Sequence, residues 1–262
     1  MTYQDISYKK QGAIALVKLN RPAAMNSVSE TMMEELADLF PKLDQDSDIR
    51  VAVLTGEGKA FCAGADLKLL LDDIKDGAKP APNFWTRARD GFGAVTRFRK
   101  PLLVAINGVV CAGGLELAMA GDILLAAESA KLADAHANFG VFPGAGGAVV
   151  LSRKIPWNAA NYLLFTGDFV DAQQMKEWGL LLDVITDDDL MEHTMKMAKK
   201  IANKSPLALQ RMKQMVKDGL DMPLDTALRA ELNMLHLQTK SHDLQEGLAA
   251  FGEKRKPEFK GY

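Results

Sequence analysis

The sequence predicts an α/β fold with a largely parallel sheet, followed by a helical extension. Two observations support this prediction. In the first half of the chain, short apolar runs that end in turn residues alternate with stretches of helical periodicity, which is typical of βαβ units. After Gly147 the strand-like runs give way to helical segments, so we expect the rest of the chain to be mostly α-helical.

The first elements follow in order from the N-terminus. Residues 14–19 are an apolar run that stops at Asn20-Arg21-Pro22, as expected for a strand that enters a loop. Ser27 and Glu30 have the spacing of a capping box and precede a predicted helix. The apolar face of that helix would be formed by Met33, Leu36, Ala37, Phe40 and Leu43. Residues 50–55 are predicted to form a buried strand.

The same pattern continues further along the chain. Residues 101–106 and 122–126 are predicted strands, and a helix over 115–120 that ends at Gly121 lies between them. Residues 72–92 combine glycine, prolines and mixed charges, and are predicted to form a mobile loop. The helices expected after Gly147 cover residues 159–165, 172–178, 190–202, 207–216 and two stretches within 224–252.

The composition excludes several classes of protein. With 262 residues the chain can form one domain or two, and its formal net charge of −2 argues against nucleic-acid or membrane-surface binding through bulk charge. The N-terminus lacks a secretory signal pattern, and no apolar run approaches the ~20 residues of a membrane span. Cys62 and Cys111 have no CxxC spacing, so we expect reduced thiols, no metal site and a cytoplasmic location.

Three glycine-rich stretches are the first candidates for a functional site: residues 63–66, 112–114 and 143–147. Two of them lie where a predicted strand ends and a helix begins. Backbone N–H groups at a helix N-terminus are unpaired and can stabilise a carbonyl oxygen that becomes negative during a reaction. None of the stretches has the G-x-G-x-x-G or P-loop pattern, which excludes nucleotide phosphate sites of those types.

These stretches belong to a set of motifs that runs in order over nearly the whole chain. The set comprises NRP at 20–22, AFCAGADL at 60–67, KP at 100–101, NG at 107–108, GGLELA at 113–118, PGAGG at 143–147, LFTG at 164–167 and EKRKP at 253–257. In this order it resembles the crotonase, or enoyl-CoA hydratase/isomerase, superfamily. A single string would be weak evidence, whereas the ordered set is specific.

The resemblance implies the crotonase fold, which is a spiral of repeated ββα turns with a helical trimerisation region. We assign residues 1–195 to the α/β core and residues 196–262 to the helical C-terminal oligomerisation region. The resemblance also implies a homotrimer or a hexamer made of two trimers. The substrate would be an acyl-coenzyme A (CoA) thioester, with no cofactor besides the CoA of the substrate.

The resemblance also assigns binding residues. The thioester oxygen would be held in an oxyanion hole by the backbone N–H groups of Ala65 and Gly113. The residues expected along the CoA moiety are Ala24, Met25, Ala63, Gly64, Asp66 and Leu67. The basic tail at 254–256 would either meet phosphate groups or form a solvated end of the chain.

Glu116 and His136 are the candidate catalytic residues. Glu116 matches an acid/base glutamate of the family, although any glutamate in a first helical turn interacts favourably with the helix dipole. His136 stands where hydratases have a second glutamate, and histidine titrates near neutral pH, so the two residues would divide the acid and base roles. A lone histidine is more often structural. Asp134 is a surface residue by default but could orient the ring, and His136→Glu would restore two carboxylates.

The expected function is that of an enzyme that stabilises a thioester enolate, with reversible hydration or a related lyase reaction. Gly144 stands where several isomerases of the family have an aspartate, which argues against their reaction. The alternatives are a C–C bond hydrolase or decarboxylase on the same fold, or a catalytically weakened member that binds CoA or RNA; the lack of a basic aromatic stripe argues against RNA. The acyl pocket would be shaped by Phe84, Trp85, Phe139 and Phe142.

Overall fold

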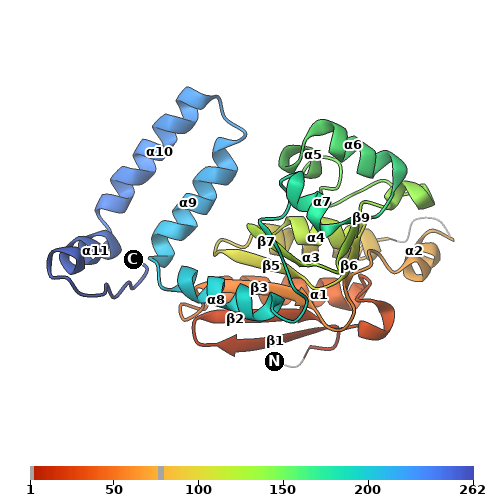
Figure 1. Ribbon diagram of the computed structural model, residues 1–262, viewed down its shortest axis with the longest axis horizontal. Coiled ribbons are helices and arrows are strands. Elements are labelled where there is room, and N and C mark those ends of the chain that lie inside the picture. The colour runs from red at the N-terminus through yellow and green to blue at the C-terminus, as the bar shows by residue number, and fades with distance from the viewer. Residues whose placement is uncertain (1–2, 76–79) are drawn as a thin grey trace.

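The computed structural model describes residues 3–75 and 80–262, and its centre is a six-stranded sheet (Figure 1). The strand order is β1-β2-β3-β5-β7-β10. The strands are β1 (Ile6–Gln11), β2 (Ile14–Leu19), β3 (Val51–Gly56), β5 (Leu102–Ile106), β7 (Ile123–Ala127) and β10 (Asp183–Ile185). Only β1 and β2 pair in antiparallel fashion within it, so the prediction of a largely parallel sheet is confirmed.

A second sheet contains four short strands in the order β4-β6-β8-β9. These are β4 (Ala60–Cys62), β6 (Val109–Cys111), β8 (Lys131–Ala133) and β9 (Val170–Asp171). Three times in succession the chain passes from a strand of the first sheet to a strand of the second, from β3 to β4, β5 to β6 and β7 to β8. A helical segment follows each pair, and this repetition is the predicted ββα spiral.

Helix α1 (Glu30–Gln45) covers the core with an apolar face. The buried residues of this face are Met32, Met33, Leu36, Leu39, Phe40 and Leu43. Its N-terminal cap is Ser29, whose hydroxyl accepts a hydrogen bond from Met32 N at 3.0 Å. The capping box predicted at Ser27 and Glu30 is therefore wrong, because Glu30 is the first helical residue.

Two helices occupy most of the segment that was predicted to be a mobile loop. They are α2 (Leu67–Ile74) and α3 (Phe84–Thr96), so the prediction is wrong for the described part of 72–92, and residues 76–79 lie outside the described residues. Asp66 caps α2, and Asn83 and Thr86 form a reciprocal capping box on α3. These caps are what allow short helices to form in a segment rich in turn residues.

The next helices complete the core. Helix α4 (Gly113–Met119) is buried along its whole length. Helices α5 (Leu151–Lys154), α6 (Trp157–Thr166) and α7 (Ala172–Glu177) lie together on the side of the molecule opposite β1 (Figure 1). Helix α8 (Leu190–Ala202) packs Ala198 and Ala202 against apolar side chains of the large sheet, and it spans the boundary predicted between residues 195 and 196.

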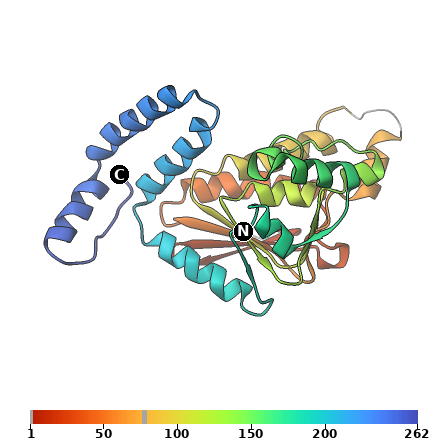
Figure 2. The same cartoon turned by 45° about the horizontal axis from the view of Figure 1, so that its top comes forward.

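The last three helices extend away from the sheets as an arm (Figures 1 and 2). They are α9 (Pro206–Gly219), α10 (Leu224–Thr239) and α11 (His242–Gly252), and neither α9 nor α10 has a buried residue. About half of the surface is exposed for each of the leucines 228, 232, 235 and 237 on α10. No helix in residues 3–75 and 80–262 is both long and apolar enough to cross a membrane.

Candidate active site

Two backbone amides lie close together, one in the loop after β4 and one at the start of α4. Ala65 lies just after β4, and Gly113 is the first residue of α4. A methyl group on Gly113 would lie 3.8 Å from Ala65 N, and one on Gly64 would lie 3.6 Å from Gly113 N. Within the described residues, neither Ala65 N nor Gly113 N donates to an acceptor in the protein. Two adjacent free donors are the arrangement that stabilises a developing oxyanion.

Unusual backbone conformations hold these two amides in place. Ala112 has φ 48° and ψ −124°, a strained conformation for a residue with a side chain, and Gly64 has φ 88°. Gly113 itself has room for a methyl group, whereas one on Gly114 would lie 2.2 Å from Cys62 O. Gly114 is therefore required for the close contact between α4 and β4, and Gly113 leaves space beside its own amide.

Glu116 points from the first turn of α4 into the same region and is buried. Its Oε1 accepts hydrogen bonds from Ala145 N at 2.7 Å and Gly147 N at 2.8 Å. Burial raises the pKa of Glu116 above its ordinary value, although the hydrogen bonds from these two amides and the charge of His136 oppose the shift. The 143–147 stretch thus fixes one oxygen of the carboxylate and leaves Oε2 available.

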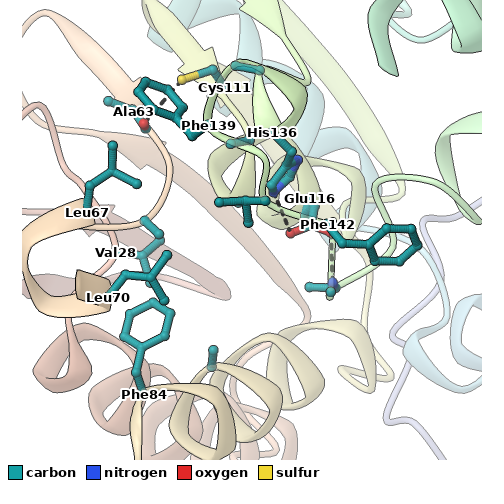
Figure 3. Close-up of a pocket in the computed structure, with 18 of the residues that line it drawn as sticks. Val28, Ala63, Leu67, Leu70, Phe84, Cys111, Glu116, His136, Phe139 and Phe142 are labelled. Carbon is teal, nitrogen blue, oxygen red and sulfur yellow. Dashed lines mark hydrogen bonds and ion pairs between the residues drawn. The ribbon is translucent and has the colours of Figure 1, made fainter. Parts of the chain in front are cut away.

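His136 faces Oε2 of Glu116 across a short distance (Figure 3). It begins the 3₁₀ helix η2 (His136–Phe139), is buried, and holds Nε2 3.8 Å from that oxygen. Its Nδ1 lies 2.9 Å from Oδ1 of Asp134. Burial alone would lower the pKa of His136, but the hydrogen bond to Asp134 and the charges of Asp134 and Glu116 outweigh burial and raise it.

These groups open on a cavity of about 420 Å³ whose wall is mostly apolar (Figure 3). Ala65, Gly113, Glu116 and His136 all line it, so the structure brings together the four predicted oxyanion and acid/base residues. The four aromatic residues that were expected to shape the acyl pocket also line it, and these are Phe84, Trp85, Phe139 and Phe142. Sequence reasoning missed several further lining residues, namely Val28, Leu70, Arg89, Phe92 and Phe169.

The residues predicted to bind CoA fall into two groups. Ala63 and Leu67 line the cavity, together with Ala65. Ala24, Met25, Gly64 and Asp66 are not among the residues that line it. Met25 follows the 3₁₀ helix η1 (Pro22–Ala24) and accepts a hydrogen bond from Ala63 N at 3.0 Å, so the two segments are adjacent.

Asp66 has structural partners in this region. It caps α2, and its carboxylate lies 3.3 Å from a guanidinium nitrogen of Arg21. The Arg21 guanidinium also donates to Ser27 O at 2.6 Å, which ties the loop around η1 to the start of α2. Contact between CoA and Asp66, or any other residue of this group, stays a prediction.

Comparison with known proteins identifies the family. The family model for enoyl-CoA hydratase/isomerase matches residues 9–262. The chain belongs to this family. It is 34% identical to the 2,3-dehydroadipyl-CoA hydratase of Escherichia coli (strain K12) over 98% of this chain and 99% of that protein. It is also 34% identical to the 1,2-epoxyphenylacetyl-CoA isomerase of the same organism, with 98% of each chain covered.

The fold comparison agrees with the family assignment. A crystal structure of the enoyl-CoA hydratase from Bacillus anthracis matches with a TM-score of 0.92 and 35% identity, over 99% of this chain and all of that one. The crotonase fold expected from the motifs is therefore confirmed, and the protein is an acyl-CoA-processing enzyme of the enoyl-CoA hydratase/isomerase type.

Proposed function

We propose that this enoyl-CoA hydratase/isomerase family member reversibly hydrates an α,β-unsaturated acyl-CoA, with Glu116 and His136 as its acid/base pair. The observation that carries the proposal is the 3.8 Å separation between Glu116 Oε2 and His136 Nε2 in a cavity that also presents the free amides of Ala65 and Gly113. One water molecule can lie within hydrogen-bond reach of both groups, next to donors for a thioester oxygen.

The steps of this reaction follow from the geometry. Glu116 Oε2 takes a proton from water, and the water oxygen bonds to the β-carbon of the substrate. The electron pair of the double bond moves toward the thioester oxygen, which becomes an enolate oxygen held by Ala65 N–H and Gly113 N–H. The imidazolium of His136 then donates its Nε2 proton to the α-carbon. A water molecule that enters after product release relays the proton from Glu116 to His136 across the 3.8 Å gap, which restores both groups.

The wall of the cavity supports a large, apolar acyl group as the substrate class. Six aromatic side chains line it, and these are Phe84, Trp85, Phe92, Phe139, Phe142 and Phe169. Phe142 is 80% exposed and Phe139 is 65% exposed, so a substrate bound there would remove a large apolar surface from water. A short acyl group such as crotonyl would leave most of this surface wet.

The residue at position 144 favours hydration over isomerisation. Among the relatives are both a hydratase and an isomerase. Gly144 lines the cavity here, whereas several isomerases of the family place an aspartate at the matching position. The chain has no carboxylate there to move a proton between substrate carbons, which supports hydration.

Further proposals concern assembly and location. The exposed leucines of α10, together with the exposed Met212, Val216 and Leu220 of the α9 segment, support a homotrimer or hexamer in which these faces are covered. We also propose a cytoplasmic location and a reaction that needs no cofactor apart from the CoA of the substrate.

A substrate panel tests the proposed function. The purified protein would be incubated with crotonyl-CoA, trans-2-octenoyl-CoA and cinnamoyl-CoA, and products would be identified by mass spectrometry. We expect the mass of one water to be added, with kcat/KM about 10-fold or more higher for the two larger esters, since each buried methylene contributes about 0.8 kcal/mol.

Other outcomes would change the assignment. If none of the three esters gains water, a β-diketone substrate and a malonyl-type CoA ester would test the C–C bond hydrolase and decarboxylase alternatives, and a cleaved or decarboxylated product would favour them. If calorimetry with millimolar CoA esters showed no binding, the proposed function would be wrong at its first step.

A further inference from the structure

Asp134 contacts His136 of the acid/base pair but has no role in the hydration scheme. It directly follows β8, and only 1% of its surface is exposed, so the expectation of a surface residue is wrong. Ala135, between Asp134 and His136, adopts a left-handed conformation with φ 57°. This turn brings two side chains that are two residues apart to the same side of the chain, where they form a hydrogen bond.

Most contacts of the Asp134 carboxylate are with His136. Oδ1 lies 2.9 Å from Nδ1 of the ring and 3.4 Å from the backbone nitrogen of His136. Oδ2 is buried and has no hydrogen-bond partner in the described part of the chain. A methyl group on Gly147 would lie 2.9 Å from Oδ2, so the backbone packs closely against it. A carboxylate only accepts, and therefore Nδ1 must carry the proton.

The charges around the His136 ring also favour a proton on Nδ1. A buried carboxylate is costly unless a cation compensates it, and the His136 imidazolium is the cation that contacts Asp134. The ionisable groups that face the ring are Asp134 after β8 and Glu116 on α4, and the thiol of Cys111 on β6 lines the same cavity. Both carboxylates stabilise the protonated ring.

We propose that Asp134 is the positioning residue of the active site. It fixes the His136 ring so that Nδ1–H donates a hydrogen bond to Asp134, and Nε2 alone faces the substrate and Glu116. The row Asp134–His136–Glu116 thereby does the work that two glutamates do in hydratases of this family. The proposal rests on the proposed function for its catalytic meaning, whereas the tautomer and charge of His136 are measurable without any substrate.

The row also revises the expectation for His136→Glu. The new carboxylate would lie between Asp134 and Glu116, with no cation in contact, so like charges would repel one another in a buried site. We now expect His136→Glu alone to be less active than wild type. The double variant Asp134→Asn with His136→Glu removes one of the three charges, and should be both more stable and more active than His136→Glu.

The test combines spectroscopy with kinetics. Imidazole ¹⁵N NMR of the intact protein, with His136 assigned by comparison with His136→Gln, should show the Nδ1–H tautomer at high pH. Asp134→Asn should move the His136 titration midpoint to lower pH and reduce kcat by about 10²-fold, with KM changed less than a few-fold. In a His136→Gln background, Asp134→Asn should cost no further activity, because the two residues act as a unit.

A control variant removes a carboxylate elsewhere. Asp187 accepts hydrogen bonds from the backbone nitrogen and hydroxyl of Ser129, neither residue lines the cavity, and Asp187→Asn should leave the His136 titration unchanged. An Nε2–H tautomer in the wild-type protein, or an Asp134→Asn variant whose His136 titrates as in wild type, would overturn the proposal. The tautomer measurement does not depend on the Asp134→Asn variant, so it decides the matter even if Asp134→Asn does not fold. A correct tautomer in an enzyme that hydrates no ester would instead refute only the proposed function.

Discussion

One half of the candidate site is built from backbone and the other half from side chains. The amides of Ala65 and Gly113 are held by the ends of β4 and α4, and no ionisable group is part of them. On the other side, Glu116 and His136 contribute titratable atoms, and their pKa values are shifted by burial, by each other and by Asp134. The amides can serve any thioester, whereas the side chains decide which protons move.

This difference separates what substitutions can do to the two halves. A backbone donor cannot be deleted without changing the fold around it, but it can be blocked by a neighbouring group. A side chain can be exchanged with little effect on the fold when its size is kept. The two halves should therefore respond differently to substitution and to pH.

The largest expected effect comes from the side-chain half. Glu116→Gln keeps the size of the side chain and an oxygen for the amides of Ala145 and Gly147, but it cannot take a proton from water. We expect kcat to fall about 10³-fold or more on the best ester of the panel, with little change in melting temperature. Glu128→Gln, at an exposed position, is the control and should retain full activity. A Glu116→Gln enzyme within ten-fold of wild type would assign the base elsewhere.

The backbone half should show its effect at two adjacent glycines. A methyl group on Gly113 fits the fold and lies 3.8 Å from Ala65 N, so Gly113→Ala should crowd the oxyanion hole and cost about 10²-fold in kcat without unfolding the protein. Gly114→Ala would place its methyl group 2.2 Å from Cys62 O and should instead lower the melting temperature strongly. Gly252→Ala, where nothing lies within 4 Å, is the control. Equal loss of stability in both variants would remove the distinction between these glycines.

A smaller effect is expected in the pH profile. Glu116 must be ionised and His136 protonated, so kcat/KM should rise as pH increases through the raised pKa of Glu116 and fall as pH passes the raised pKa of His136. His136→Gln should remove the falling limb. It should also move the rising limb to higher pH, because the charge of His136 lowers the pKa of Glu116. Gly113→Ala should leave both limbs of the pH profile in place. A shift of either limb in this variant would show that the backbone half of the site affects the ionisation of the side-chain half.

The sequence predicted the strands and helices that are long enough to show an apolar run or a periodicity. The strands at 14–19, 50–55 and 101–106 are continuous apolar runs, and the structure has strands there. The second sheet was not predicted, because its strands have only two or three residues and no measurable periodicity. Helix α3 was missed because Gly91 and Gly93 lie inside it, and its capping by Asn83 was not recognised.

The candidate site was predictable to a similar degree. Ala65, Gly113 and Glu116 come from motifs whose order along the chain is specific, and all three line the cavity. The burial of Asp134 was not predictable, because it depends on the left-handed turn at Ala135 and on the approach of Gly147 from a distant segment. The basic tail was left with two interpretations, and its Arg255 is already paired with Glu246 at 2.6 Å and with Glu253.

Cys111 places a sulfhydryl group in the wall of the proposed acyl-CoA cavity. A thiolate there could attack the acyl carbonyl and exchange CoA for the protein's own sulfur, which would leave the enzyme S-acylated. Burial raises the pKa of Cys111 to about 11, and its Sγ donates to Ala63 O at 3.2 Å. The raised pKa keeps this thiol protonated near neutral pH, so the reactive thiolate is scarce. The apolar wall proposed to accommodate the acyl chain would thus also protect the enzyme from acylation by its own substrate.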